Sequence, residues 1–182
     1  MGMSKKDIKA KVVADLSSGA AKSEVFSRLS GQGIKDSQLA YFIAAYADAR
    51  LCDEHSRKVD NLVFLMVAQS LLAAIIGYGV GAHLGPNAKW VVGALLALIP
   101  ILFAWGFYKH YVGMYNGYIF LAIIQLPQSL KGFMATPIAS SVGIAIGAGV
   151  LAYVWYVRGK IFPDFAFFSP RKIKGKYVFS CN

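Results

Sequence analysis

Few residues of this chain combine the types and spacing that chemistry needs, and Cys52 with His55 comes nearest to a metal pattern. The C-x-x-H spacing supplies two ligands, whereas a zinc site takes about four. His83 and His110 lie elsewhere, at what we expect to be opposite faces of a membrane. We therefore interpret residues 48–60 as a solvated helix beside a membrane and expect no metal and no cofactor.

A catalytic arrangement is not indicated either. Hydrolysis inside a membrane needs a nucleophile with a base in reach, such as a Ser–His pair or two Asp residues. Ser140 and Ser141 are expected near the outer face and His110 near the inner one. Residues 61–163 contain no Asp or Glu, the groups that usually carry proton-coupled transport. The sequence therefore predicts a protein that is not an enzyme.

Small residues at helical spacing form the clearest local pattern. The tripeptide Gly77-Tyr78-Gly79 matches potassium selectivity filters, but those follow a re-entrant helix and need four subunits. Here the tripeptide ends an apolar segment of helix length. A small residue every four positions favours close helix contact. We expect such helix-packing positions at Gly77, Gly81, Ala139, Gly143 and Gly147. For the last three, the partner is either the segment 61–82 or another protomer.

These patterns lie within an apolar region that predicts four transmembrane helices. The chain is 57% hydrophobic, and residues 61–163 hold only five Lys or Arg. A hydrocarbon core about 30 Å thick is crossed by about 20 apolar residues in a helix. The expected spans are residues 61–82, 89–108, 111–130 and 138–157. The predicted fold class is therefore all-α: a polytopic membrane protein with a small N-terminal helical domain on the cytosolic side.

Five polar residues fall inside the expected spans: Gln69, Asn116, Gln125, Ser140 and Ser141. An amide that faces lipid is costly, so each should face the bundle and find a partner. At 1.5 Å per residue, Gln69 and Asn116 reach similar depths from the inner face. We therefore predict that Gln69 pairs with Asn116, and Gln125 with Ser140 or Ser141, in structural roles. The alternative is that these groups line a solute path.

Residues 1–60 predict a compact head of three short amphipathic helices followed by a linker. Their apolar stripes are Ile8, Val12, Val13 and Leu16; Val25, Phe26 and Leu29; Leu39, Phe42, Ile43 and Tyr46. Ser4 is the expected first N-cap, and Asp36 or Ser37 the third. The order resembles a helix-turn-helix, but the third helix offers only Gln38 and Arg50 for base contacts. We therefore expect no nucleic-acid partner.

The distribution of Lys and Arg predicts orientation. Ten precede the first span, Lys109 lies between spans two and three, and six lie in residues 158–182. Only Lys89 and Lys131 fall on the other side, and the basic side is cytosolic. We expect both termini in the cytosol and an integral membrane protein of the bacterial inner membrane.

The basic, aromatic tail, residues 158–182, allows two structures after Pro170. The segment RKIKGKYVFS forms either a strand or hairpin over the head or a partly ordered basic tail. Before it, four phenylalanines are expected at the lipid headgroup boundary: Phe162, Phe165, Phe167 and Phe168.

Two functions fit these observations. The first is a non-enzymatic membrane protein that acts through protein contacts, as an accessory subunit, an assembly factor or an immunity protein. Its partners are then the lipid bilayer and either another protein or further copies of itself. The alternative is a subunit of a homo-oligomeric channel or small-solute transporter, because four short spans hardly enclose an aqueous path alone.

Overall fold

The computed structural model describes residues 4–131 and 137–180, and the side chains of residues 126, 128–131 and 137–139 also lie outside the described part. The described structure is 74% helical and 4% strand, so the all-α class is confirmed. The chain divides into two compact units. We call residues 1–51 with 159–182 the terminal unit, and residues 52–158 the apolar unit. Residues 159–182, the larger part of the predicted tail, belong to the same unit as residues 1–51 of the predicted head.

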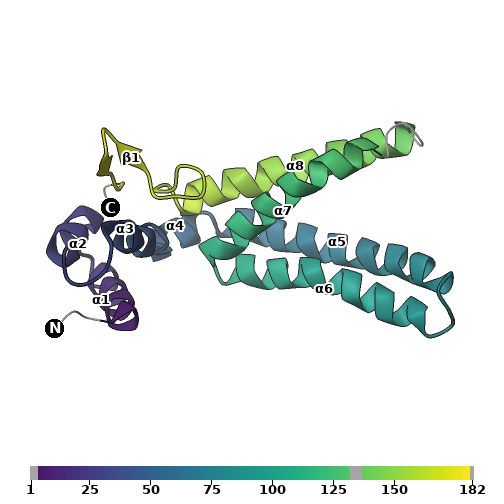
Figure 1. Ribbon diagram of the computed structural model, residues 1–182, viewed down its shortest axis with the longest axis horizontal. Helices are drawn as coiled ribbons and strands as arrows, with labels where there is room; N and C mark the ends of the chain where they lie inside the picture. Colours follow the sequence, from purple (N-terminus) through teal and green to yellow (C-terminus); the bar gives the residue numbers. More distant parts are fainter. Residues whose placement is uncertain (1–3, 132–136, 181–182) are drawn as a thin grey trace. The chain divides into compact units, whose positions relative to one another are not determined.

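The terminal unit contains α1 (Lys5–Ser17), α2 (Lys22–Leu29) and α3 (Asp36–Ala44) (Figure 1). The Ser4 hydroxyl accepts a hydrogen bond from the Asp7 N–H, which confirms the first N-cap. The glycines of both turns have positive φ: Gly19, Gly31 and Gly33. The third cap differs from the prediction. Lys35 stands at the N-cap, and Asp36 lies in the first turn, where its negative charge suits the helix dipole.

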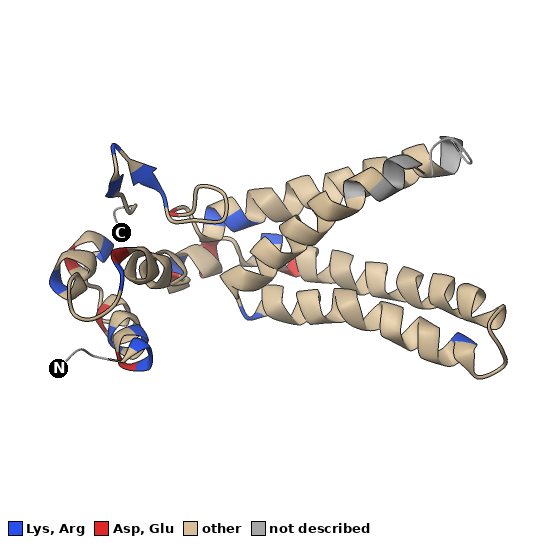
Figure 2. Cartoon of the chain, in the orientation of Figure 1, with Lys and Arg blue, Asp and Glu red and all other residues tan. Residues whose placement is uncertain are grey.

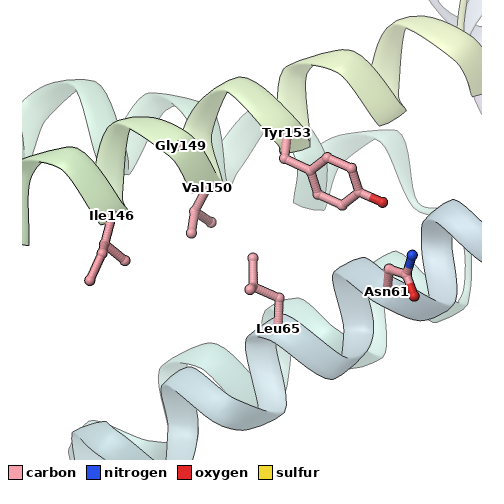
Figure 3. A pocket seen from close by; sticks show the side chains of 6 residues that line it. All are labelled: Asn61, Leu65, Ile146, Gly149, Val150 and Tyr153. Carbon is pink, nitrogen blue, oxygen red and sulfur yellow. The ribbon is translucent and has the colours of Figure 1, made fainter.

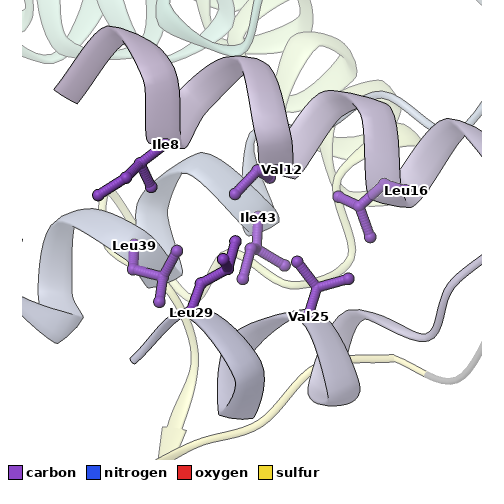
Figure 4. Close-up of a cluster of buried hydrophobic side chains, with 7 residues drawn as sticks. All are labelled: Ile8, Val12, Leu16, Val25, Leu29, Leu39 and Ile43. Atoms are coloured by element: carbon purple, nitrogen blue, oxygen red, sulfur yellow. The ribbon is translucent and has the colours of Figure 1, made fainter. Parts of the chain in front are cut away.

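Seven apolar side chains from these three helices form the core of the terminal unit, each at most 4% exposed (Figure 4). They are Ile8, Val12, Leu16, Val25, Leu29, Leu39 and Ile43. Val13 was predicted to join them but is 46% exposed. It lies about 100° around α1 from Val12, outside the stripe that recurs every four residues.

The C-terminal segment completes this unit. It forms an antiparallel hairpin of β1 (Lys172–Ile173) and β2 (Lys176–Tyr177), so the hairpin alternative is confirmed. Phe179 packs against the helical core. Phe162 and Phe165 are buried, at 1% and 8% exposure, which corrects their predicted place at the lipid boundary. These rings pack within the protein instead. The Phe165 ring, for example, meets the Tyr41 ring edge-on at a centroid distance of 5.5 Å.

The apolar unit begins within α4 (Ala49–Glu54). It contains α5 (Ser56–Ala82), α6 (Ala88–Tyr108), α7 (Val112–Lys131) and most of α8 (Pro137–Ile161). These helices coincide with the four expected segments, although α5 begins five residues early. Within residues 4–131 and 137–180, three helical segments are long and apolar enough to cross a membrane: Ser56–Ala82, Ala88–Tyr108 and Ser140–Ile161. This finding indicates a membrane protein. The described apolar part of α7, Val112–Gln125, is shorter.

Candidate functional site

Glycines of α5 bring its backbone close to the backbone of α6 within the apolar unit. A Cβ atom on Gly81 would lie 2.5 Å from the Lys89 Cα, and one on Gly77 would lie 2.8 Å from the Gly93 Cα. The Ser70 hydroxyl also donates a hydrogen bond of 3.0 Å to the Ala97 carbonyl on α6. Figure 1 shows the two helices side by side. Gly77 and Gly81 are therefore occupied by a contact within the chain.

The glycines of α8 are in a different situation. Gly143 and Gly147 are exposed, and a Cβ atom on either would meet no described atom within 4 Å. Gly149 is also exposed and has no described atom within 4 Å of a Cβ position, although it was not among the predicted helix-packing residues. The Ala139 side chain lies outside the described residues. Packing of this face against α5 is thus not seen at Gly143 or Gly147, and contact with another protomer stays a prediction.

A cleft of about 460 Å³ separates part of α8 from α5 (Figure 3). Its lining is mainly apolar and consists of Asn61, Leu65, Ile146, Gly149, Val150 and Tyr153. The Tyr153 hydroxyl donates a hydrogen bond of 3.1 Å to the Lys58 carbonyl and joins the two helices near their polar ends. Val154 is fully buried, whereas Ile146 is 59% exposed. The helices are therefore joined at one end of the cleft and open at the other.

Among the polar residues of the expected spans, Gln69 has a different partner from the predicted Asn116. A side-chain hydrogen bond joins Gln69 to Tyr118 on α7. The buried Asn116 Oδ1, predicted to pair with Gln69, has no hydrogen-bond partner within the described chain. Residues two apart on a helix point about 200° apart, so the two side chains leave α7 in different directions. The Tyr118 ring also meets the Phe103 ring of α6 edge-on, at 5.2 Å.

The second predicted pairing stays a prediction. Gln125 is exposed on α7, and on α8 Ser140 is half-buried and Ser141 exposed. All three residues take part in interactions. They lie beside residues 126–139, most of whose side chains are outside the described part.

The turn between α6 and α7 holds a histidine in an unusual environment. His110 has a φ of 53°, and its Nδ1 atom is buried without a hydrogen-bond partner among the residues described. Burial lowers the pKa of His110 below its ordinary value of 6.5, and the nearby Asp60 carboxylate opposes this shift. The imidazole is therefore neutral at pH 7. Close by, the Tyr115 hydroxyl donates to the Phe107 carbonyl at 3.3 Å.

The metal pattern around His55 and the tripeptide Gly77-Tyr78-Gly79 were the other candidates for chemistry in the sequence. His55 is buried, with its Nδ1 atom 3.4 Å from the Lys58 Nζ and 4.0 Å from a Glu54 carboxylate oxygen. In residues 4–131 and 137–180, no three His, Cys, Asp or Glu side chains gather as a metal site would require. The tripeptide Gly77-Tyr78-Gly79 lies inside α5. Its Tyr78 ring packs edge-on against Trp90, at 5.2 Å.

Sequence reasoning missed a buried ion pair in the terminal unit. The Lys22 Nζ donates to the Asp164 Oδ2 at 2.7 Å, and both side chains are 2% exposed. The other carboxylate oxygen of Asp164 accepts from the Ser180 N–H. One signal was present in the sequence: Asp164 is the only acid after residue 60 and stands in an aromatic segment. A lone carboxylate in such a segment predicts a buried partner.

Comparison of the chain with known protein families, with characterised proteins and with solved structures finds no match.

Proposed function

We propose that this chain is a four-span membrane protein that acts without catalysis, through contact with another protein inside the bilayer. The observation that carries the proposal is the open face of α8, where the cleft toward α5 adjoins exposed glycines. We further propose that both termini are cytosolic and that the membrane is a bacterial inner membrane. The charge distribution supports this orientation, with seventeen Lys and Arg on the proposed inner side and two on the outer.

The presence of both ends of the chain in the terminal unit supports four membrane spans rather than three. Residues 1–51 precede all the apolar helices, residues 159–182 follow them, and both belong to one compact unit. Both segments must then lie on the same side of the membrane, which requires an even number of crossings. Among the described residues, three helices have the length and apolarity of spans, and we propose α7 as the fourth. Its 20 residues measure about 30 Å, the thickness of the hydrocarbon core.

We predict that a reporter active only outside the cytosol will be active when fused after Lys131 and inactive when fused after Asn182. The physical reason is the fourth crossing by α7 followed by the return through α8. The measured quantity is the reporter activity of each fusion, divided by the amount of that fusion in the membrane. If the fusion after Asn182 is active and the fusion after Lys131 is inactive, α7 does not cross the membrane.

The contrast between two sets of glycines supports docking on α8. Gly77 and Gly81 of α5 lie against the α6 backbone, whereas a Cβ atom on Gly143 or Gly147 would meet no described atom within 4 Å. Exposed apolar side chains alone do not indicate a partner, because lipid covers them in a bilayer. A glycine face beside a cleft is different, since it lets a second helix approach closely enough for backbone contact. The proposed partner is therefore a transmembrane helix.

We predict that a photo-crosslinking amino acid at Ile146 will trap one protein of defined mass in native membranes. Gly147→Leu should reduce this adduct by roughly tenfold or more, because its side chain fills the space that a close helix would occupy. Gly79→Leu on α5 is the matched control, since Gly79 is also exposed with open space.

Three results would contradict this docking proposal. One is that only lipid adducts form, and another is that the two leucine variants lose the adduct equally. The third is an adduct at twice the mass of the chain together with solute flux through reconstituted liposomes. That combination would favour the homo-oligomeric channel.

A further inference from the structure

The C-terminal hairpin displays a concentrated positive charge on an ordered scaffold. Strand β1 pairs with β2 in the register Lys172 to Tyr177 and Ile173 to Lys176. Lys174 and Gly175 form the turn, with φ values of 49° and 79°. Positive φ at both central residues is typical of the type I′ turn of two-residue hairpins. The turn fixes the direction in which the neighbouring lysines leave the backbone.

No acidic residue stands in the hairpin or in the segments that flank it directly. Residues 165–180 contain four basic residues and no acidic one, and Figure 2 shows the hairpin coloured for Lys and Arg. Arg171, Lys172, Lys174 and Lys176 are all exposed. The preceding acid, Asp164, is buried against the Lys22 ammonium group. The hairpin itself therefore carries four exposed positive charges and no negative one.

Aromatic contacts hold the hairpin against the helices of the terminal unit. The Phe26 ring of α2 lies 5.5 Å from the Tyr177 ring and 5.6 Å from the Phe179 ring, between centroids. The Arg171 N–H donates to the Asp164 carbonyl at 2.7 Å. Since the scaffold is ordered, little conformational entropy is lost when the basic side chains meet a ligand.

Exposed apolar side chains accompany the charges. Ile173 lies in the hairpin and is 47% exposed, and Phe167 is 46% exposed before it. A surface that combines Lys and Arg with exposed apolar groups suits the headgroup and acyl boundary of a bilayer. Nucleic acid uses the same charges but gains little from an exposed isoleucine. This combination favours anionic lipid over nucleic acid.

We propose that the hairpin, residues 171–177, binds the phosphate groups of anionic phospholipids at the membrane surface where α8 ends. Ten residues lie between Ile161, the last residue of α8, and Lys172, so eleven steps along the backbone join the two. Extended chain spans at most about 3.5 Å per residue, so the hairpin is confined to within about 39 Å of that end. Confinement raises the local concentration of headgroups. Each basic residue near an anionic surface adds roughly fivefold to the partition.

The test uses the full chain in nanodiscs, with Cys52 and Cys181 replaced by Ser and a polarity-sensitive fluorophore attached through Ile173→Cys. We expect the emission to shift to the blue when phosphatidylglycerol is added to a zwitterionic bilayer. High salt should reverse the shift, because screening weakens exposed charge interactions. The variant Lys172→Gln, Lys174→Asn, Lys176→Gln should lose it. Asparagine is chosen at position 174 because it tolerates positive φ.

The matched control removes three exposed lysines elsewhere in the same unit, through Lys5→Gln, Lys9→Gln and Lys11→Gln on α1. This control should keep the full shift. The proposal is overturned if the emission is the same in both bilayers, or if the two triple variants behave alike. A blue shift in the zwitterionic bilayer on addition of inorganic phosphate or single-stranded RNA would also overturn it, since another phosphate source would then be the ligand.

Discussion

Gly81→Ala is expected to separate the α5–α6 pair and to destabilise the apolar unit strongly. The added methyl group would lie 2.5 Å from the Lys89 Cα and 2.7 Å from the Ala88 carbonyl oxygen. Both are backbone atoms, so no side-chain rotation relieves the overlap. Overpacking typically costs about 1–3 kcal/mol, and we expect the upper end of that range. The midpoint of thermal unfolding in detergent, followed by tryptophan fluorescence, measures the effect.

Gly147→Ala is the control for this substitution. The same methyl group at Gly147 would meet no described atom within 4 Å. Alanine is also favoured over glycine inside a helix by about 0.5–1 kcal/mol. The control should therefore unfold at the same temperature as the unaltered chain or slightly above it. Equal midpoints for the two alanine variants would show that α5 and α6 do not touch at Gly81.

Lys22→Met is expected to open the terminal unit, because it leaves the Asp164 carboxylate buried without its ion-pair partner. Both side chains are 2% exposed, and removing one partner of a buried ion pair typically costs about 3–5 kcal/mol. The protein has two units, so a single unfolding midpoint does not isolate this loss. Hydrogen exchange of α1–α3, read by mass spectrometry on the full chain, follows the terminal unit directly.

The double variant Lys22→Met with Asp164→Leu is the informative comparison. It removes both charges and leaves apolar groups of similar size, which is often neutral or stabilising at a buried pair. Exchange protection should therefore recover relative to Lys22→Met alone. If the single substitution leaves protection unchanged, the ion pair is not buried as described. If the double variant is worse than the single one, the hydrogen bond from Ser180 to Asp164 matters more than the charges.

The parts of the fold that follow from local spacing were predictable. Ile8, Val12 and Leu16 recur every four residues and are buried, and Gly19 adopts the positive φ that its position after a helix predicts. The apolar helices followed from the length of the uncharged segments. Each of these features depends on residues within a few turns of one another.

Contacts between distant segments were not predictable in the same way. Lys22 and Asp164 are 142 residues apart, and no periodicity relates them. The partner of Gln69 depends on how α7 is rotated about its own axis. The depth of a residue along the helix does not specify this rotation, and Gln69 bonds to Tyr118 rather than to the predicted Asn116. Similarly, small residues every four positions mark both α5 and α8, but only their neighbours in space show that one face is covered and the other open.

The joining of both chain ends in one unit has a consequence for biosynthesis. Phe26 and Tyr41 emerge early from the ribosome, whereas their ring partners Phe179 and Phe165 emerge last. At about 5–20 residues per second, the 142 residues between Lys22 and Asp164 take roughly 7–28 s to synthesise. During that interval the early helices expose aromatic surface and an unpaired lysine. Maturation of the terminal unit therefore reports that every intervening helix has been made, and a prematurely terminated chain keeps a surface that chaperones and proteases recognise.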